Sequence, residues 1–315
     1  MRSIPVVDLS QFKSGDEAQE RAFVSALGTA FREVGFVSVI NHGIDHTMVK
    51  EFYDAAYSFF KLPKDVKQKY EIPGAAGQRG YTSFGKEHAR QSKVADLKEF
   101  FQIGQEINSG DYTSADLPSD VKVDEVPAFG SVGRDLYRAF EATGALLLKA
   151  IARYLDLEDG YFHERIQHGS SILRAIHYPP ITEEPASAIR AEQHEDINLI
   201  TLLVGASAGG LQVMNKDGEW VDVQTDDSEI VVNVGDMLQR LTNDYLKSTT
   251  HRVVNPPREL WHTPRLSIPF FLHPRAEMDL TSLPNTITAG NPSRYEPITA
   301  GEYLDERLRE IGLKK

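Results

Sequence analysis

In the first half of the chain, apolar side chains recur every three or four positions over several long stretches. This spacing predicts amphipathic helices, because it places the apolar residues on one face. The predicted helices are residues 17–34, 45–61 and 127–155, with a short one that starts at Pro63. Short apolar runs between them predict strands at residues 4–9, 36–40 and 97–103.

Two polar stretches interrupt this pattern. Residues 73–95 are rich in Gly, Lys, Arg and Ser, and we interpret them as a long loop that carries Gly80 and Tyr81. Long loops in compact domains often cover a binding site. Residues 108–127 are acidic and contain two prolines, so they predict a connection outside the core.

From about residue 171 onward the chain consists of short apolar runs separated by turn signals. They predict strands at residues 173–178, 198–204, 211–215, 220–223, 230–234, 251–255 and 265–272. Short strands at such spacing are typical of a β-sandwich or barrel. A final helical stripe covers residues 299–312. The pattern therefore predicts an α+β fold with helices first, a barrel second and a helix last.

Charge and composition exclude several classes of protein. The 315 residues carry a formal net charge of −12 without a marked Lys/Arg cluster, so nucleic acid is not an expected partner. No apolar run approaches the roughly 18 residues of a membrane span, and the N-terminus lacks the features of an export signal. The chain contains no cysteine. We therefore expect a cytoplasmic protein without disulfides.

Two histidines and one acidic residue carry the most specific chemical signal. His194 and Asp196 flank Glu195, and residues i and i+2 of an extended strand project to the same side, so both can reach one ion while Glu195 faces away. His251 follows in a later predicted strand. Two imidazoles and one carboxylate suit octahedral Fe(II) with open positions, whereas a structural zinc site takes four ligands, often cysteines. Taken alone, His251 would more simply be a hydrogen-bonded strand histidine.

A second signal is the pair Arg265 and Ser267, which share one face of a predicted strand. A guanidinium and a hydroxyl side by side form a receptor for a carboxylate, and a buried arginine without an anion would cost several kcal/mol. The alternative is an exposed edge strand with a solvated arginine. The apolar residues that follow, Ile268 to Leu272, weaken that alternative.

Several short motifs stand along the chain in a fixed order. They include IPVVDL from residue 4, VINHGI at 39–44, FFKLP at 59–63, GGLQV at 209–213, VNVGD at 232–236 and HRV at 251–253. Together with the histidines and the Arg-x-Ser pair, they resemble the motifs of the Fe(II)- and 2-oxoglutarate-dependent dioxygenases of the isopenicillin N synthase-like superfamily. The resemblance implies a bacterial member of this superfamily. The resemblance covers nearly the full chain.

The resemblance implies a double-stranded β-helix, or jelly roll, at residues 166–280. An N-terminal, mostly helical region at 1–165 would pack on it, and a helical extension would follow at 281–315.

The resemblance also assigns roles to residues. It implies that the metal ligands are His194, Asp196 and His251, and that the 2-oxoglutarate contacts are Arg265, Ser267 and Tyr178. The implied reaction uses O2 to convert 2-oxoglutarate into succinate and CO2. It couples this conversion to the hydroxylation, desaturation or ring closure of an unidentified small molecule.

One segment departs from the family pattern. Many plant members have Asn-Tyr-Tyr-Pro where this chain has Ile176-His177-Tyr178-Pro179, so an Asn that can assist co-substrate binding is absent. His177 alternates away from Tyr178, which favours a structural role. Side chains that could contact the substrate, or simply belong to the core, are Tyr81, Phe101, Leu199, Phe271 and His273.

Four other functions remain open at this point. An oxidase of the isopenicillin N synthase type needs no 2-oxoglutarate, and ethylene- or succinate-forming oxygenases share the same motifs. A non-catalytic metal-binding jelly roll gives no reason for Arg265 and Ser267. A zinc hydrolase requires a general base near a metal-bound water, and Glu195 would point the wrong way.

Overall fold

The larger of the two β-sheets in the described residues forms the centre of the molecule. The computed structural model describes residues 4–87, 94–106, 119–185, 187–205, 207–224, 226 and 228–314. Within these ranges the larger sheet has nine strands, in the order β1 (Val6–Asp8), β2 (Phe36–Ile40), β10 (Ile230–Val234), β7 (Ile200–Val204), β13 (Pro269–Leu272), β5 (Ile172–Tyr178), β4 (Glu99–Gly104) and β3 (Gly80–Thr82), with β12 (Arg265–Ser267) also pairing with β5. Only β1 and β2 pair in parallel among them.

A smaller antiparallel sheet carries two of the motif histidines. Its described strands run in the order β6 (Ala191–His194), β11 (His251–Val253), β8 (Leu211–Met214) and β9 (Trp220–Asp222). A cavity of about 550 Å³ is lined by residues of both sheets, so it lies between them. This two-sheet arrangement is the predicted α+β jelly roll.

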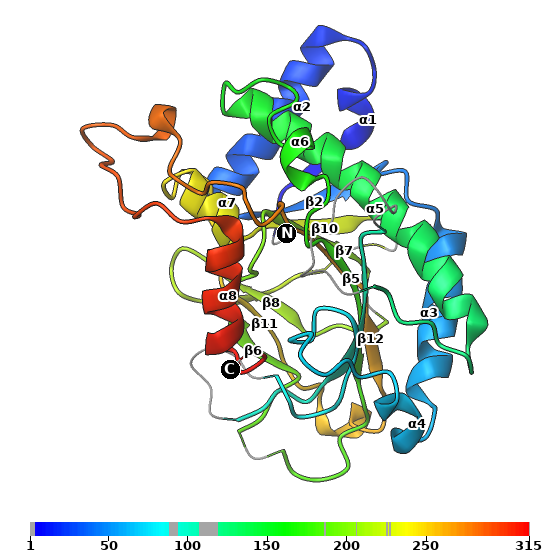
Figure 1. Cartoon of the computed structure of the whole chain (residues 1–315). Coiled ribbons are helices and arrows are strands. Elements are labelled where there is room, and N and C mark those ends of the chain that lie inside the picture. The colour runs from blue at the N-terminus through cyan, green and yellow to red at the C-terminus, as the bar shows by residue number, and fades with distance from the viewer. Residues whose placement is uncertain are drawn as a thin grey trace.

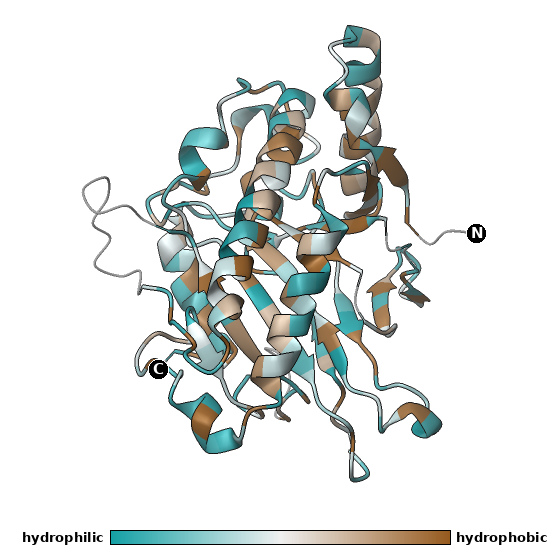
Figure 2. Cartoon of the chain, turned by 90° about the vertical axis from the view of Figure 1, so that its right-hand side faces the viewer, coloured by the Kyte–Doolittle hydropathy of each residue, from teal (hydrophilic) through white to brown (hydrophobic). Residues whose placement is uncertain are grey.

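Long helices cover one side of the larger sheet. They are α2 (Glu17–Glu33), α3 (His46–Phe60) and α5 (Pro127–Tyr154), and they pack against each other and the strands, while α8 (Ala300–Glu310) lies on the opposite side (Figure 1). Figure 2 shows hydrophobic and hydrophilic segments alternating around these helices. This is the amphipathic pattern that the sequence predicts. The absence of a side chain at Gly144 allows α5 to lie directly against Leu272 of the sheet.

Shorter helices occupy the connections. They are α1 (Leu9–Phe12), α4 (Lys64–Gln68), α6 (His163–Ile166), α7 (Asp236–Leu241) and the 3-10 turns η1 (Arg258–Leu260) and η2 (Pro284–Thr286). The final helix α8 begins with a capping box, in which the Thr299 and Glu302 side chains each accept from the other's backbone N–H. None of the described helices combines the length and the hydrophobicity that a membrane-spanning segment needs.

The predicted loop at residues 73–95 is wrong at Gly80 and Tyr81. These residues belong to β3, which pairs with β4, and Tyr81 is buried. A strand of three residues is too short to give an apolar pattern, and its stability comes from the neighbouring strand. Gly80 has a positive φ of 70°, and a Cβ there would overlap the Tyr70 carbonyl oxygen. Residues 88–93 of that loop and 108–118 of the predicted connection lie outside the described residues.

Two further differences concern the second half. A helix that the sequence did not predict, α7, follows β10 directly, and the strand expected at 265–272 is divided at Ile268 into β12 and β13. β12 pairs with β5 alone, whereas β13 pairs with both β5 and β7. Arg265 and Ser267 line the cavity together with Pro269 and Phe271, so the alternation of faces continues across Ile268.

Candidate metal centre

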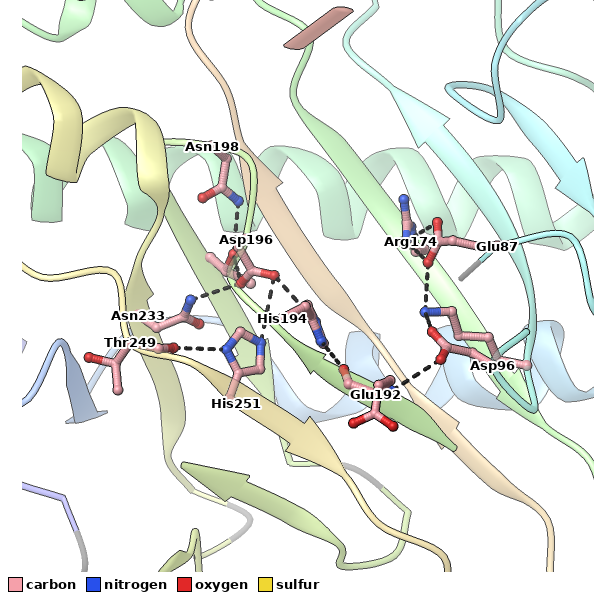
Figure 3. A network of polar contacts seen from close by, with 12 residues as sticks. Glu87, Asp96, Arg174, Glu192, His194, Asp196, Asn198, Asn233, Thr249 and His251 are labelled. Atoms are coloured by element: carbon pink, nitrogen blue, oxygen red, sulfur yellow. Dashed lines mark hydrogen bonds and ion pairs between the residues drawn. The ribbon is translucent and has the colours of Figure 1, made fainter. Parts of the chain in front are cut away.

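The three predicted metal ligands converge at the wall of the cavity. His194 ends β6 and His251 begins β11, and the two residues are paired across these strands. The His194 and His251 Nε2 atoms lie 3.9 and 3.7 Å from the same Asp196 oxygen, Oδ1. The ligand atoms of all three lie within 4.8 Å of one another, and Figure 3 shows the side chains pointing toward a common point. The arrangement is a facial triad of two imidazoles and one carboxylate.

Backbone carbonyls fix the orientation of both imidazole rings. His194 Nδ1 lies 2.6 Å from the Glu192 carbonyl oxygen, and His251 Nδ1 lies 3.1 Å from that of Thr249. Because a carbonyl oxygen only accepts, each Nδ1 carries the proton and each Nε2 keeps a lone pair for a metal.

The Asp196 carboxylate is held by its other oxygen. Asp196 Oδ2 accepts hydrogen bonds from Thr201 Oγ1 at 2.6 Å and from Asn233 Nδ2 at 2.8 Å. Thr201 Oγ1 in turn accepts from Asn198 Nδ2 at 2.8 Å. Oδ1 is therefore left to face the histidines. Glu195 is exposed, accepts from Thr250 and does not belong to the convergent group of ligand atoms, although it also lines the cavity.

The charge states of the triad suit a divalent cation. Burial and the neighbouring His251 lower the pKa of His194 to about 4, so its ring is neutral near pH 7. Burial alone would raise the pKa of Asp196, but the two histidines and the hydrogen bonds from Asn233 and Thr201 lower it. Asp196 is therefore a carboxylate. One negative and two neutral ligands match the donor set of non-haem Fe(II).

The anion receptor predicted from Arg265 and Ser267 lies in the same cavity. Both residues are buried and line the cavity, and Arg265 is paired with Tyr178 across β12 and β5. The Arg265 Cζ atom lies 5.1 Å from the centroid of the Tyr178 ring. Arg265 Nε donates to the Ala208 carbonyl oxygen at 2.9 Å, but its buried Nη1 has no hydrogen-bond partner among the described residues. A free donor on a buried guanidinium fits an absent carboxylate.

The His177 side chain lies on the face of β5 opposite to that of Tyr178, which lines the cavity. Its Nδ1 is 2.8 Å from Glu99 Oε1, and its ring stacks on Phe60 at 5.0 Å between centroids. The Glu99 carboxylate also accepts from Lys67 at 2.7 Å and from Tyr81. The structural role favoured for His177 is confirmed, because its contacts lie outside the cavity lining.

The expected substrate contacts divide into two groups. Phe271 and His273 line the cavity, whereas Tyr81, Phe101 and Leu199 are buried in the core away from it.

Charged residues that the sequence did not single out form a further wall of the cavity. Lys98 Nζ lies 2.6 Å from Glu87 and 2.7 Å from Asp96, and Arg174 Nη1 lies 3.3 Å from Glu87. Arg174 also donates to Gln102 at 2.8 Å. The sequence contains one indication of this wall, because Arg174 interrupts the apolar run of β5. Thr201 and Asn233 interrupt β7 and β10 in the same way.

A redox-active metal bound by such a triad, beside a receptor for a carboxylate, is the arrangement of a non-haem iron oxygenase that uses an acidic co-substrate. Comparisons with known proteins agree. Residues 4–123 match the model described as non-haem dioxygenase in morphine synthesis N-terminal, and residues 169–274 match that of the 2OG-Fe(II) oxygenase superfamily. The chain belongs to this superfamily.

Individual relatives match over almost their whole length. A proline hydroxylase, buaE, of Petromyces alliaceus is 34% identical, over 96% of this chain and 97% of that protein. The crystal structure of a 2OG-Fe(II) oxygenase family protein from Caulobacter crescentus is 41% identical with a TM-score of 0.88, over 99% and 100% of the two chains. A full-length Neurospora crassa protein, solved in complex with alpha-KG, is 33% identical with a TM-score of 0.85, over 97% and 95%.

These findings confirm the enzyme class and its cofactors. The protein is an Fe(II)- and 2-oxoglutarate-dependent oxygenase, and its facial triad consists of His194, Asp196 and His251.

Proposed function

We propose that His194, Asp196 and His251 bind the Fe(II) and that Arg265, Ser267 and Tyr178 hold the distal carboxylate of 2-oxoglutarate. One observation carries the proposal: the convergent triad and the unpartnered Nη1 of Arg265 belong to the same cavity. In this proposal, a five-carbon dicarboxylate binds the metal with one end and the arginine with the other.

When bound, Fe(II) supplies the redox chemistry that couples O2 to the decarboxylation of 2-oxoglutarate. The protein supplies orientation and electrostatics. The Glu192 and Thr249 carbonyls keep the protons on Nδ1 of the two histidines. Thr201 and Asn233 keep one oxygen of Asp196 turned to the metal position.

We further propose that the substrate is a small polar molecule held against the wall of Glu87, Lys98 and Arg174. With Asp96, this wall has two cations and two carboxylates in mutual contact, so it offers donors and acceptors without excess charge. Hydroxylation is the outcome to test first, because the Petromyces relative is named a hydroxylase. The 41% identity with the Caulobacter chain supports a bacterial member of the superfamily.

The division at residues 165 and 280 stays a prediction. The separate matches at 4–123 and 169–274 support a break between them. Strands β1 to β4 of the N-terminal region nevertheless belong to the larger sheet. We therefore propose one folding unit with an N-terminal region, a jelly-roll core and a C-terminal extension. The cytoplasmic location also stays a prediction.

The metal assignment is tested by comparing Asp196→Ala with Glu195→Gln. Asp196→Ala should lose high-affinity Fe(II) binding and O2-dependent succinate release. Glu195→Gln is the matched control, since Glu195 is exposed and does not belong to the convergent group of ligand atoms, and it should keep Fe(II) binding. Unchanged Fe(II) affinity in Asp196→Ala would refute the assignment.

A further inference from the structure

A second buried arginine lies beside the proposed carboxylate receptor. Arg190 directly precedes β6, and both it and Arg265 are 2% exposed. The Cζ atoms of Arg190 and Arg265 lie 5.9 and 5.1 Å from the centroid of the same ring, that of Tyr178. Two guanidinium groups thus share one aromatic neighbour in the interior.

Neither guanidinium has a carboxylate partner among the described residues. Arg190 Nη2 donates to the Thr263 carbonyl oxygen at 3.0 Å and Arg265 Nε to that of Ala208 at 2.9 Å. Arg190 Nε and Arg265 Nη1 are buried without a hydrogen bond to any described group. Burial, followed by the charge of Arg265, lowers the pKa of Arg190 to about 10. Arg190 therefore remains a cation near pH 7.

Two adjacent buried cations without counter-charges are unfavourable, because each loses hydration and they repel each other. An anion between or beside them would offset both effects. In the proposed function that anion is the distal carboxylate of 2-oxoglutarate at Arg265. Arg190 does not line the cavity, so it would act on this carboxylate through its field rather than by contact.

We propose that Arg190 is a positioning residue of the co-substrate site, which supplies a second positive charge for the distal carboxylate and anchors the segment before Arg265. This inference rests on the proposed role of Arg265. The simpler alternative is that Arg190 only holds Thr263 in place, two residues before Arg265. The two differ in one respect: a charge effect depends on the charge of the bound acid, whereas a packing effect does not.

The test compares 2-oxoglutarate with 2-oxopentanoate, which has the same chain length but a methyl group in place of the distal carboxylate. Binding of each acid to the anaerobic Fe(II) protein is measured by calorimetry. The variants are Arg190→Gln, which is neutral but can still donate to Thr263, and Arg190→Lys, which keeps the charge. Arg258→Gln is the control, since its side chain is 81% exposed and pairs only distantly with Glu184.

Arg190→Gln should weaken 2-oxoglutarate binding on the order of tenfold, the size expected for a charge several Å away at intermediate dielectric. It should leave 2-oxopentanoate binding within about twofold, by the same argument. Arg190→Lys should restore most of the loss, and Arg258→Gln should resemble wild type. If Arg190→Gln does not fold, Arg190→Met replaces it, with the melting temperature measured for each variant.

Equal weakening for both acids, or no weakening for either, would overturn the inference. Different results would contradict the proposed function of the cavity itself. If wild type does not prefer 2-oxoglutarate over 2-oxopentanoate, or Arg265→Ala keeps that preference, the carboxylate receptor itself is wrong. If wild type prefers 2-oxoglutarate, Arg265→Ala loses the preference and Arg190→Gln keeps it, then only the role of Arg190 is wrong.

Discussion

At the scale of single residues, the metal site depends on side chains that orient the ligands as well as on the ligands themselves. His194, Asp196 and His251 supply the ligand atoms. Thr201 and Asn233 come from two other strands and reach Asp196 only after the sheet has formed. In the sequence, each appears only as a polar residue within an apolar strand, and this pattern does not show which group the residue contacts.

Removing one of these orienting groups should weaken the metal site. Thr201→Val keeps the shape of the side chain but removes the 2.6 Å hydrogen bond to Asp196 Oδ2. We expect Fe(II) affinity to fall by roughly 10-fold or more, as is typical for partners of metal ligands. Metal titration monitors this, with Thr281→Val as control, an exposed threonine that likewise donates to a carboxylate, that of Asp279. Equal Fe(II) affinity in the two variants would contradict the role given to Thr201.

The charged wall should make stability depend on pH. Burial alone would raise the pKa of Glu87, but Lys98 and Arg174 lower it from 4.5 to about 2. A carboxyl with a depressed pKa stabilises the fold above its unfolded pKa, and this contribution is lost as the pH falls from about 4.5 to about 2. The contribution is at most about 3 kcal/mol, from 1.36 kcal/mol per pKa unit.

Glu87→Gln should therefore be less stable than wild type at pH 7. As the pH falls from 4.5 to 2, its free energy of unfolding should decrease less than that of wild type. Urea unfolding at a series of pH values measures both quantities. Glu17→Gln is the control, because its side chain is 88% exposed in an ion pair with Arg21, and such pairs contribute little. A Glu87→Gln curve parallel to that of wild type across this pH range would show that Glu87 is not held ionised by its neighbours.

At the scale of elements, long periodic segments were predicted well and short ones were not. The helices expected at 17–34, 45–61 and 127–155 agree with α2, α3 and α5 to within one residue at each end. Each has enough turns to repeat its apolar stripe, so its pattern is visible without tertiary contacts. β3 and α7 have three and six residues and depend on their neighbours.

The junction between β10 and α7 gives a test at this scale. Gly235 caps α7, and a Cβ at this position would overlap both the side-chain oxygen and the backbone of Asn198. Gly235→Ala should lower the free energy of unfolding by about 1–3 kcal/mol and weaken Fe(II) binding, because Asn198 supports Thr201. Gly130→Ala is the control in α5, where a Cβ meets nothing closer than 3.9 Å, and it should be neutral or stabilising. Wild-type stability in Gly235→Ala would show that this junction is not tightly packed.

At the scale of the whole molecule, the fold brings together chemistry that is scattered along the chain. The triad comes from the smaller sheet and the segment after it, whereas Arg265, Ser267 and Tyr178 come from β12 and β5 of the larger sheet. The sequence predicted both groups, since each sits in a local motif. The two groups face one cavity, which the charged wall and α8 also line. This arrangement depends on how the sheets pack, so it could not be predicted from periodicity.

The most direct test of this arrangement is an anaerobic titration of the Fe(II) protein with 2-oxoglutarate, followed by visible absorption. If the acid chelates the iron held by the triad while Arg265 receives its distal end, a weak metal-to-ligand charge-transfer band should appear, and Arg265→Ala should require much more 2-oxoglutarate to produce it. If Fe(II) binds but wild type shows no band, or Arg265→Ala gives the band at the same concentration, the shared cavity does not hold 2-oxoglutarate in this way.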